Sequence, residues 1–314
     1  MTTISAKIIA DSINGVGNRL TTIHMRYPRF IHAELMTHRV FSRNARSSRA
    51  VPVKTMIEEI MTDPVVPLHW GKNQKGMQAE HECDEPVSIY VGPEHGGDGV
   101  WPFPREKAWL KARDQAVKMA VNFNDAGYHK QIVNRLLEPF MHIDVLVSAT
   151  EWANFLWLRD HKDAEPHIAM LAREVRQVMD ASTPDPLMPG QWHLPYVPHW
   201  ERADLVKAVT GHDWPEKWVE ADYLAMIKVS AARCARISYK PFDGTSETDY
   251  DAEIKRYDLL VGSQPMHASP VEHQATPDYW WPGSNEWDRP EKHGNFVGWI
   301  QHRKTLEGEN HDGR

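Results

Sequence analysis

The sequence is poor in cysteine and lacks both a long apolar run and a basic leader. Cys83 and Cys234 are the only cysteines among 314 residues, which excludes a disulfide framework and a cysteine-based zinc site. No apolar run approaches the roughly 18 residues of a membrane span. The opening "MTTISAKIIADSI" has neither the basic start nor the apolar stretch of a signal peptide. We therefore expect a soluble, cytoplasmic protein with no membrane partner.

Metal-binding and nucleic-acid-binding signatures are also missing. The 18 histidines include no His-x-x-x-His or His-Glu-x-x-His pair, so the sequence predicts no metal site. The net charge of -7 is unlike that of a general nucleic-acid binder, which usually shows a basic footprint, so we expect no stable nucleic-acid partner. The 41% hydrophobic and 25% charged residues are typical of a globular protein with enough chain to bury a core.

Against this acidic background, one segment is strongly basic. Residues 30–54, "FIHAELMTHRVFSRNARSSRAVPVK", contain no acidic residue after Glu34, and the next one in the chain is Glu58. The basic side chains are His38, Arg39, Arg43, Arg46, Arg49 and Lys54. Arginines beside Ser47 and Ser48 supply the bidentate charged donors, hydroxyls and amides that a phosphate needs. The segment predicts a site for a nucleotide phosphate and a cofactor; the alternative is a solvated basic surface.

The spacing of apolar residues predicts a mixture of helices and strands. Residues 6–12 and 19–26 alternate as strands do, around the turn sequence "NGVGN", and "HIDVLVSAT" is a third strand. Helices are predicted for 28–37, 52–66, 105–123, "HKQIVNRLLEPF", "TEWANFLWLRD", "AEPHIAMLAREVRQVM", about 215–238, and 250–262. Segments 67–104 and 186–200, rich in Pro and Trp, are expected to be loops. Without a βαβ rhythm, the predicted class is α+β, with mixed helices around an antiparallel sheet.

The basic segment resembles a family signature. "THRVFSRNARSSR" is similar to the pattern of the flavin-dependent thymidylate synthases, which is Arg-His-Arg, seven residues, then Ser with an Arg two positions on. The matching residues are His38, Arg39, Ser47 and Arg49, with Ser42 and Asn44 also as the family commonly has them. Thr37 replaces the first Arg, Ala45 replaces a common Glu, and Glu34 replaces the usual Gln. These departures indicate an altered pocket.

A second block, "NRLLEPF" followed by "VLVSATEWANFLWLRD", also resembles the family. The resemblance implies that Arg135 contacts the nucleotide phosphate, Asn154 the flavin and Arg159 the pyrimidine ring. An arginine aimed at the pyrimidine carbonyl would stabilise negative charge as C5 becomes nucleophilic, which makes Arg159 the predicted catalytic residue. The alternative is that Arg159 only pairs with Asp160 or Asp163.

A third block is informative through its position. "SAARCARISY" and "MHASPVEHQ" are similar to the family's N-terminal helix and histidine segment, but here they follow the signature by almost 200 residues. This order indicates a circular permutation, which is tolerable because domain termini often lie close together. We expect one domain, 1–314, with the signature half in 1–182 and the displaced segment in 216–275. Residues 67–104 would be an insert, either a specificity lid or a subunit contact.

The resemblance implies FAD as cofactor, NADPH and methylenetetrahydrofolate as co-substrates, a deoxypyrimidine monophosphate as substrate, and a homotetramer with sites between subunits. The flavin-binding residues would be Thr37, His38, Arg39, Asn44, Asn154, Ser238, His267 and Ser269. The substrate-binding residues would be Glu34, Ser47, Ser48, Arg49, Arg135 and Arg159. Trp280, Trp281 and Trp287 in the tail could stack on a folate or nicotinamide ring, but such residues more often pack on a core or a partner subunit.

Three functions remain open. The first is methylation of dUMP to dTMP; neither cysteine suits a thiolate nucleophile, which favours the flavin-dependent class. The second follows from Glu34, because a carboxylate accepts from the exocyclic amine of cytosine but faces lone pairs at uracil O4. The substrate would then be dCMP and the product 5-hydroxymethyl-dCMP. The third is a non-catalytic nucleotide- or RNA-binding protein with the same fold.

Overall fold

The computed structural model, which describes residues 2–93, 96–213, 218–238, 242 and 249–310, begins with the predicted hairpin. Strands β1 (Ser5–Ile13) and β2 (Arg19–Pro28) pair antiparallel. The Asn14 side-chain oxygen accepts from the backbone N–H groups of Val16 and Asn18 at 3.2 and 2.8 Å, and Gly17 adopts a φ of 92°. This turn chemistry explains why "NGVGN" joins the two strands.

The third predicted strand lies inside the sheet. Strand β6 (His142–Ala149) lies antiparallel between β2 and β3 (Ser42–Ala45), and all of its residues are buried. The order β3-β6-β2-β1-β7 is completed by the short β7 (Asp185–Pro186), which runs parallel to β1. The basic segment therefore supplies an edge strand, β3, and is fixed to the centre of the fold.

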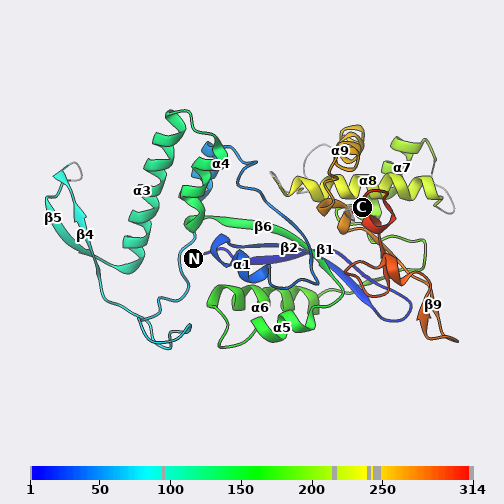
Figure 1. Ribbon diagram of the computed structural model, residues 1–314, viewed down its shortest axis with the longest axis horizontal. Helices are drawn as coiled ribbons and strands as arrows, with labels where there is room; N and C mark the ends of the chain where they lie inside the picture. Colours follow the sequence, from blue (N-terminus) through cyan, green and yellow to red (C-terminus); the bar gives the residue numbers. More distant parts are fainter. Residues whose placement is uncertain (1, 94–95, 214–217, 239–241, 243–248, 311–314) are drawn as a thin grey trace.

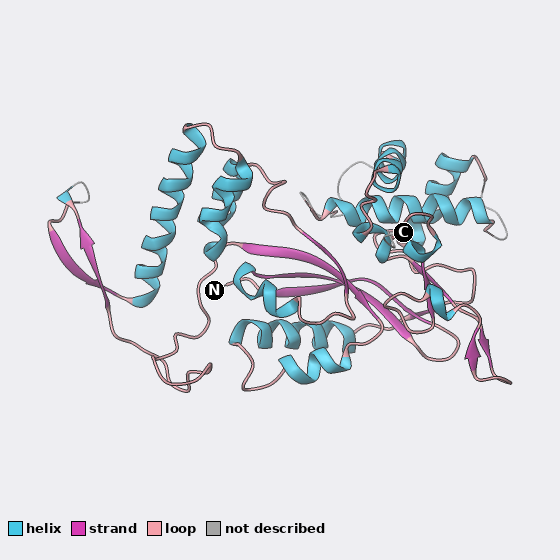
Figure 2. Ribbon diagram, in the orientation of Figure 1, coloured by secondary structure: helices cyan, strands magenta, loops and turns pink. Residues whose placement is uncertain are grey.

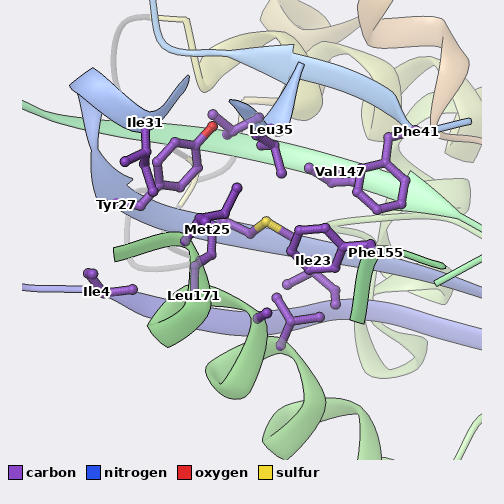
Figure 3. Close-up of a cluster of buried hydrophobic side chains, with 14 of the residues drawn as sticks. Ile4, Ile23, Met25, Tyr27, Ile31, Leu35, Phe41, Val147, Phe155 and Leu171 are labelled. Carbon is purple, nitrogen blue, oxygen red and sulfur yellow. The ribbon is translucent and has the colours of Figure 1, made fainter. Parts of the chain in front are cut away.

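One face of the sheet is covered by two predicted helices, α5 (Ala153–Arg159) and α6 (Pro166–Asp180) (Figure 1). Helix α6 begins at Pro166 because the preceding Glu165 carboxylate accepts from the N–H groups of the first turn. Figure 3 shows Ile23, Met25 and Val147 of the sheet meeting Leu171 of α6 and Phe155 of α5. The helix predicted for 28–37 is shorter, a 3₁₀ turn (Arg29–Ile31) followed by α1 (His32–Leu35).

Helix α8 (Glu220–Arg236) packs on the opposite face, where Cys234 contacts Leu146 of β6. Its predicted start near 215 falls partly outside the described residues. Helix α9 (Tyr250–Gly262) was predicted, whereas α7 (Arg202–Thr210) was not; both pack beside α8 (Figure 1). Arg233 is fully buried and donates to both Glu201 carboxylate oxygens at 2.8 and 2.5 Å, which ties α8 to the 3₁₀ turn before α7.

A separate helical cluster occupies the other end of the molecule. It contains α2 (Val53–Thr62), α3 (Arg105–Asp125), α4 (Lys130–Val133) and a 3₁₀ helix (Asn134–Phe140). The helix predicted over "HKQIVNRLLEPF", ending near Pro139, does form, but only its first turn is α-helical and the rest, which contains Pro139, is 3₁₀. The predicted loop 67–104 also contains a hairpin, β4 (Val87–Val91) and β5 (Gly99–Phe103), which projects from the body (Figure 1).

The tail is ordered mainly by short elements rather than long helices (Figure 2). Strands β8 (Ala275–Pro277) and β11 (Trp299–Gln301) pair, as do β9 (Trp280–Trp281) and β10 (Glu286–Trp287). Further 3₁₀ turns lie at His199–Glu201, Ser269–Glu272, Pro290–Lys292 and His302–Thr305.

In the described residues, no helix has the length and apolar character needed to cross a bilayer.

Candidate active site

The guanidinium of Arg159, at the end of α5, is held by three residues of the basic segment. Its Nε donates to His38 Nε2 at 3.0 Å and its Nη2 to Thr37 Oγ at 3.1 Å. Its Nη1 donates to Glu34 Oε2 at 3.3 Å. The alternative partner Asp160 instead accepts from Arg173 and Arg176. The structure therefore gathers Glu34, Thr37, His38 and Arg159 from two distant segments.

His38 is an acceptor in this cluster because it is neutral. Burial, with added repulsion from Arg159 and Arg43, lowers the pKa of His38 from 6.5 to about 4. Its Nε2 lone pair accepts from Arg159, which leaves the ring proton on Nδ1. Glu34 is shifted the other way: burial first, and then Glu165, raise its pKa, while Arg159 partly opposes the shift.

A cavity of about 230 Å³ opens beside this cluster. Its lining residues are Thr37, His38, Arg39, Val40, Glu151, Asn154, Phe155 and Leu158. Four of the predicted flavin-binding residues, Thr37, His38, Arg39 and Asn154, therefore share one cavity. Arg39 and Asn154 are exposed, so their donors are open to a ligand.

The predicted phosphate-binding residues form a second group at the other end of β3. The Ser47 N–H donates to the Ser238 carbonyl at 3.0 Å, and the Ser48 carbonyl accepts from the Asn134 amide at 2.7 Å. Arg135 follows Asn134 and is exposed, as is Arg49. Among the described residues neither arginine has an acidic partner. Ser238, which was predicted to bind the flavin, therefore lies in this second group and does not line the cavity beside Asn154.

Asn44 and Ser269 lie together between the two groups, but their polar atoms are used within the chain. The Asn44 side-chain N–H donates to the Cys234 carbonyl at 2.8 Å, and Ser269 Oγ donates to Asn44 Oδ1 at 3.4 Å. His267 is exposed nearby in sequence, and its backbone N–H donates to the Leu260 carbonyl. Asn44 and Ser269 thus connect β3 to the C-terminal segments through these hydrogen bonds.

Two of the basic residues bond to other groups of the chain. Arg46 donates to both Glu59 carboxylate oxygens at 2.8 and 2.7 Å, and Arg43 donates to the Met36 and His38 carbonyls. These two arginines hold the segment in place. Among the described residues, no cluster of three or more His, Cys, Asp or Glu side chains is arranged to hold a metal.

The sequence reasoning missed several lining residues. A second cavity, of about 410 Å³, adjoins the first and is lined by Arg39, Val40, Glu151, Trp287, His293, Gly294, Asn295, Phe296 and Val297. Of these, the sequence predicts only Arg39 as a site residue, and it favours packing over ligand binding for Trp287. The only available signal for the others was the aromatic richness of the tail, which does not say where the tail folds.

Comparison with known proteins identifies the family of the chain. Residues 20–185, more than half of the chain, match the family described as thymidylate synthase complementing protein. No curated protein matches the chain. Two solved structures of the UMP/dUMP methylase PolB from Streptomyces cacaoi resemble it, bound with 5-Br UMP and 5-Br dUMP. The TM-scores are 0.42 and 0.40 at 15% and 14% identity, over 58% and 57% of this chain and 90% and 91% of those chains. The chain belongs to the thymidylate synthase complementing protein family and is a thymidylate synthase-like methyltransferase.

Proposed function

We propose that the protein transfers a one-carbon unit from methylenetetrahydrofolate to C5 of a deoxypyrimidine monophosphate, with dUMP as substrate, dTMP as product and NADPH as reductant. The observation that carries this proposal is the Arg159 cluster. A guanidinium with fixed orientation lies beside a cavity whose lining includes Thr37, His38 and Asn154. That is the arrangement the family resemblance implies for a pyrimidine next to a flavin.

The residues that line the cavity fit FAD as cofactor. The exposed Asn154 amide suits the heteroatoms of a flavin ring, and the exposed Arg39 suits its diphosphate. A bound flavin supplies hydride-transfer chemistry, while the protein supplies binding, orientation and electrostatics. His38 contributes a neutral ring, so it adds no second positive charge next to Arg159.

Arg159 would stabilise the negative charge that develops on the pyrimidine carbonyl as C5 attacks the one-carbon unit. Its three protein acceptors hold the guanidinium before substrate arrives, so little reorganisation is needed. Ser47, Ser48, Arg49 and Arg135 would bind the 5′-phosphate. The two arginines are the exposed, unpaired cations of that group in the described part of the chain, and they remain available for an anion.

We also propose that the chain is one circularly permuted domain. Asn44 and Ser47 bond to Cys234 and Ser238 of the C-terminal segments, about 190 positions away in the sequence. The predicted displaced segment therefore packs on the signature strand, as it would if it had been moved from the N-terminus. The family resemblance further implies a homotetramer with sites between subunits, to which the projecting insert 67–104 could contribute.

A second candidate function is favoured by one contact. Glu34 Oε2 lies 3.3 Å from Arg159 Nη1, so a carboxylate stands at the guanidinium assigned to the base. It could accept a hydrogen bond from the cytosine amine, whereas uracil offers only lone pairs at O4. The reaction would then convert dCMP to 5-hydroxymethyl-dCMP, with water capturing the methylene group.

The two reactions differ in redox balance, which makes them separable. The methylene of methylenetetrahydrofolate must gain a hydride to become a methyl group, whereas capture by water needs no reductant. We would give the purified protein equal dUMP and dCMP with FAD and methylenetetrahydrofolate, with and without NADPH, and weigh the nucleotides by mass spectrometry. NADPH-dependent dUMP heavier by one methylene is the expected result. A dCMP product heavier by one CH2O unit without NADPH, as replacement of the C5 hydrogen by a hydroxymethyl group requires, would establish the second function.

The variant Glu34→Gln restores the usual family residue at this position. If Glu34 accepts a hydrogen bond from the cytosine amine, the variant forms less product from dCMP and more from dUMP. Glu58→Gln, on the exposed side of α2, is the matched control. A colourless preparation that binds nucleotide and forms neither product would overturn both reactions in favour of a binding protein.

A further inference from the structure

The cavity beside Arg159 continues into a second compartment. Arg39, Val40 and Glu151 line both cavities, so the 230 Å³ and 410 Å³ spaces meet along these three residues. The far wall of the larger space comes from the tail, residues 287–297. This segment lies outside the residues that match the family, so nothing in that match assigns it a role.

The tail is attached firmly enough to form a binding wall. The Val297 N–H donates to Thr150 Oγ at 3.1 Å, just before Glu151 in the sequence, and Asn14 donates to the Gly298 carbonyl at 3.1 Å. Phe296 and Trp299 are fully buried. Position 298 requires glycine, because its φ is 78° and a Cβ would lie 2.7 Å from the Trp287 ring.

The orientation of His293 is also fixed. Its Nε2 lies 2.8 Å from the buried Asp278 carboxylate, and its Nδ1 accepts from the Gly298 N–H at 3.2 Å. The ring therefore donates from Nε2 and packs edge-on against Trp287, with centroids 5.5 Å apart. Both polar atoms of His293 are used, so it serves the wall by packing.

The polar groups left open in this compartment suit one class of ring. In the described part of the chain, the Glu151 carboxylate accepts no hydrogen bond from a side chain, and Arg39 has no acidic partner. Within the same described residues, the Asn295 amide donates to Ser42 Oγ at 3.5 Å and its oxygen accepts no hydrogen bond. A carboxylate accepts two adjacent N–H donors side by side. The 2-amino-4-oxo edge of a pterin presents such a pair, at N3 and the 2-amino group.

Charge distinguishes the folate from NADPH, the other co-substrate that carries a planar ring. A nicotinamide dinucleotide brings several phosphate charges, which Glu151 would repel. A folate carries no phosphate, and its only charges are the carboxylates of its glutamyl tail, at the end of the molecule remote from the pterin ring. Trp287 contributes aromatic surface to the lining of this compartment.

We propose that the compartment between Glu151 and the 287–297 tail binds the pterin ring of the one-carbon donor, with Glu151 reading its 2-amino edge. This inference rests on the proposed function, since it assigns the co-substrate of that reaction to a place in the same site. It also makes the tail part of the active site.

The test is the affinity for tetrahydrofolate, measured by calorimetry on the FAD-saturated protein. Glu151→Gln keeps the shape but loses the bidentate acceptor, so the Kd for tetrahydrofolate rises about 10- to 100-fold. The Kd for dUMP and for NADPH stays unchanged. Glu291→Gln, an exposed tail residue outside the compartment, is the matched control and leaves all three constants unchanged.

An unchanged Kd for tetrahydrofolate in Glu151→Gln would overturn the inference, as would a selective loss of NADPH affinity. If that happens while the wild-type protein still makes product from methylenetetrahydrofolate, the proposed function stands and only the compartment is misassigned. If the wild-type protein neither binds tetrahydrofolate nor makes product, the proposed function fails and the inference falls with it.

Discussion

At the residue scale, the two departures at positions 34 and 37 act together. Thr37 Oγ accepts from Arg159 and donates to the Glu34 carbonyl at 2.7 Å, while the Glu34 carboxylate accepts from the same guanidinium. An arginine at 37, as in the family signature, would place a second cation beside Arg159. Thr37 and Glu34 replace that repulsion with two acceptors. The two altered residues therefore act together as hydrogen-bond acceptors that orient the Arg159 guanidinium.

Replacing Arg159 tests its proposed role in the reaction. Arg159→Ala removes the proposed stabiliser of the developing carbonyl charge, so kcat should fall about 100- to 1000-fold, while the flavin absorbance of the purified protein persists. Arg159→Lys keeps a charge but cannot reach three acceptors in one plane, so it should recover only a small part of the activity. Arg173→Ala, which removes an exposed partner of Asp160, is the control. Activity of Arg159→Ala within a few-fold of wild type would remove Arg159 from the reaction.

At the scale of elements, β3 and the end of α8 depend on each other. Asn44 is buried and its amide spans the Cys234 carbonyl and the Ser269 hydroxyl. Asn44→Ala leaves the carbonyl without this donor, so the free energy of unfolding should fall by about 1 to 3 kcal/mol. Urea unfolding measures this, with the exposed Asn122→Ala of α3 as control. Equal stability of Asn44→Ala and wild type would mean that these hydrogen bonds do not hold the C-terminal segments on β3.

The elements predicted correctly are those whose local pattern agrees with their tertiary contacts. Helix α6 has an acidic cap, Pro166 in its first turn and one apolar face, so it could be located from sequence alone. Helix α7 was missed because it is short and follows a Pro-rich loop. The hairpin β4–β5 was missed because its alternation lies within a Gly- and Pro-rich insert. The 3₁₀ helix at 134–140 has apolar residues at a spacing that also fits an α-helix, so the spacing alone does not distinguish the two. Pro139, which lies inside this segment, favours the 3₁₀ form.

The site was predictable where a contiguous motif carries it, and not where distant segments meet. The Arg159 cluster combines two motifs that are each visible in sequence. The compartment between Glu151 and Asn295 depends on how the tail folds back through Val297 and Gly298, and no local pattern encodes that path. The same holds for Asn44, whose type suggested a ligand contact but whose amide is used to join two elements.

At the scale of the whole molecule, a chain of buried polar groups crosses the sheet. His193 lies between Ser12 and Thr22 at 2.9 and 2.8 Å, and Ser148 lies between Thr22 and His273 at 2.6 and 2.8 Å. The chain links both strands of the hairpin and β6 to two segments beyond residue 185. Burial lowers the pKa of both histidines from 6.5 to about 3. Both rings are therefore neutral in the folded protein near neutral pH.

These depressed pKa values make the stability fall in acid. Between pH 6.5 and about 3 the unfolded chain protonates His193 and His273 while the folded protein does not, so the unfolded state binds about two more protons at about pH 5. The stabilisation is therefore complete above pH 6.5 and is lost as the pH falls below it. His32, His38, His142 and His302, each with its pKa lowered to about 4, add to the same trend.

The double variant His193→Gln/His273→Gln isolates the polar chain across the sheet. Glutamine can bond the same hydroxyls but does not titrate, so the slope of unfolding free energy against pH near about pH 5 should decrease by about two protons. Urea unfolding from about pH 7 to about pH 4.5 gives this slope, and the exposed His161→Gln should leave it unchanged. A loss of stability that is equal at every pH would show that the histidines only pack. A smaller slope would show that their neutral rings, which join the two halves of the chain, make the fold sensitive to acid.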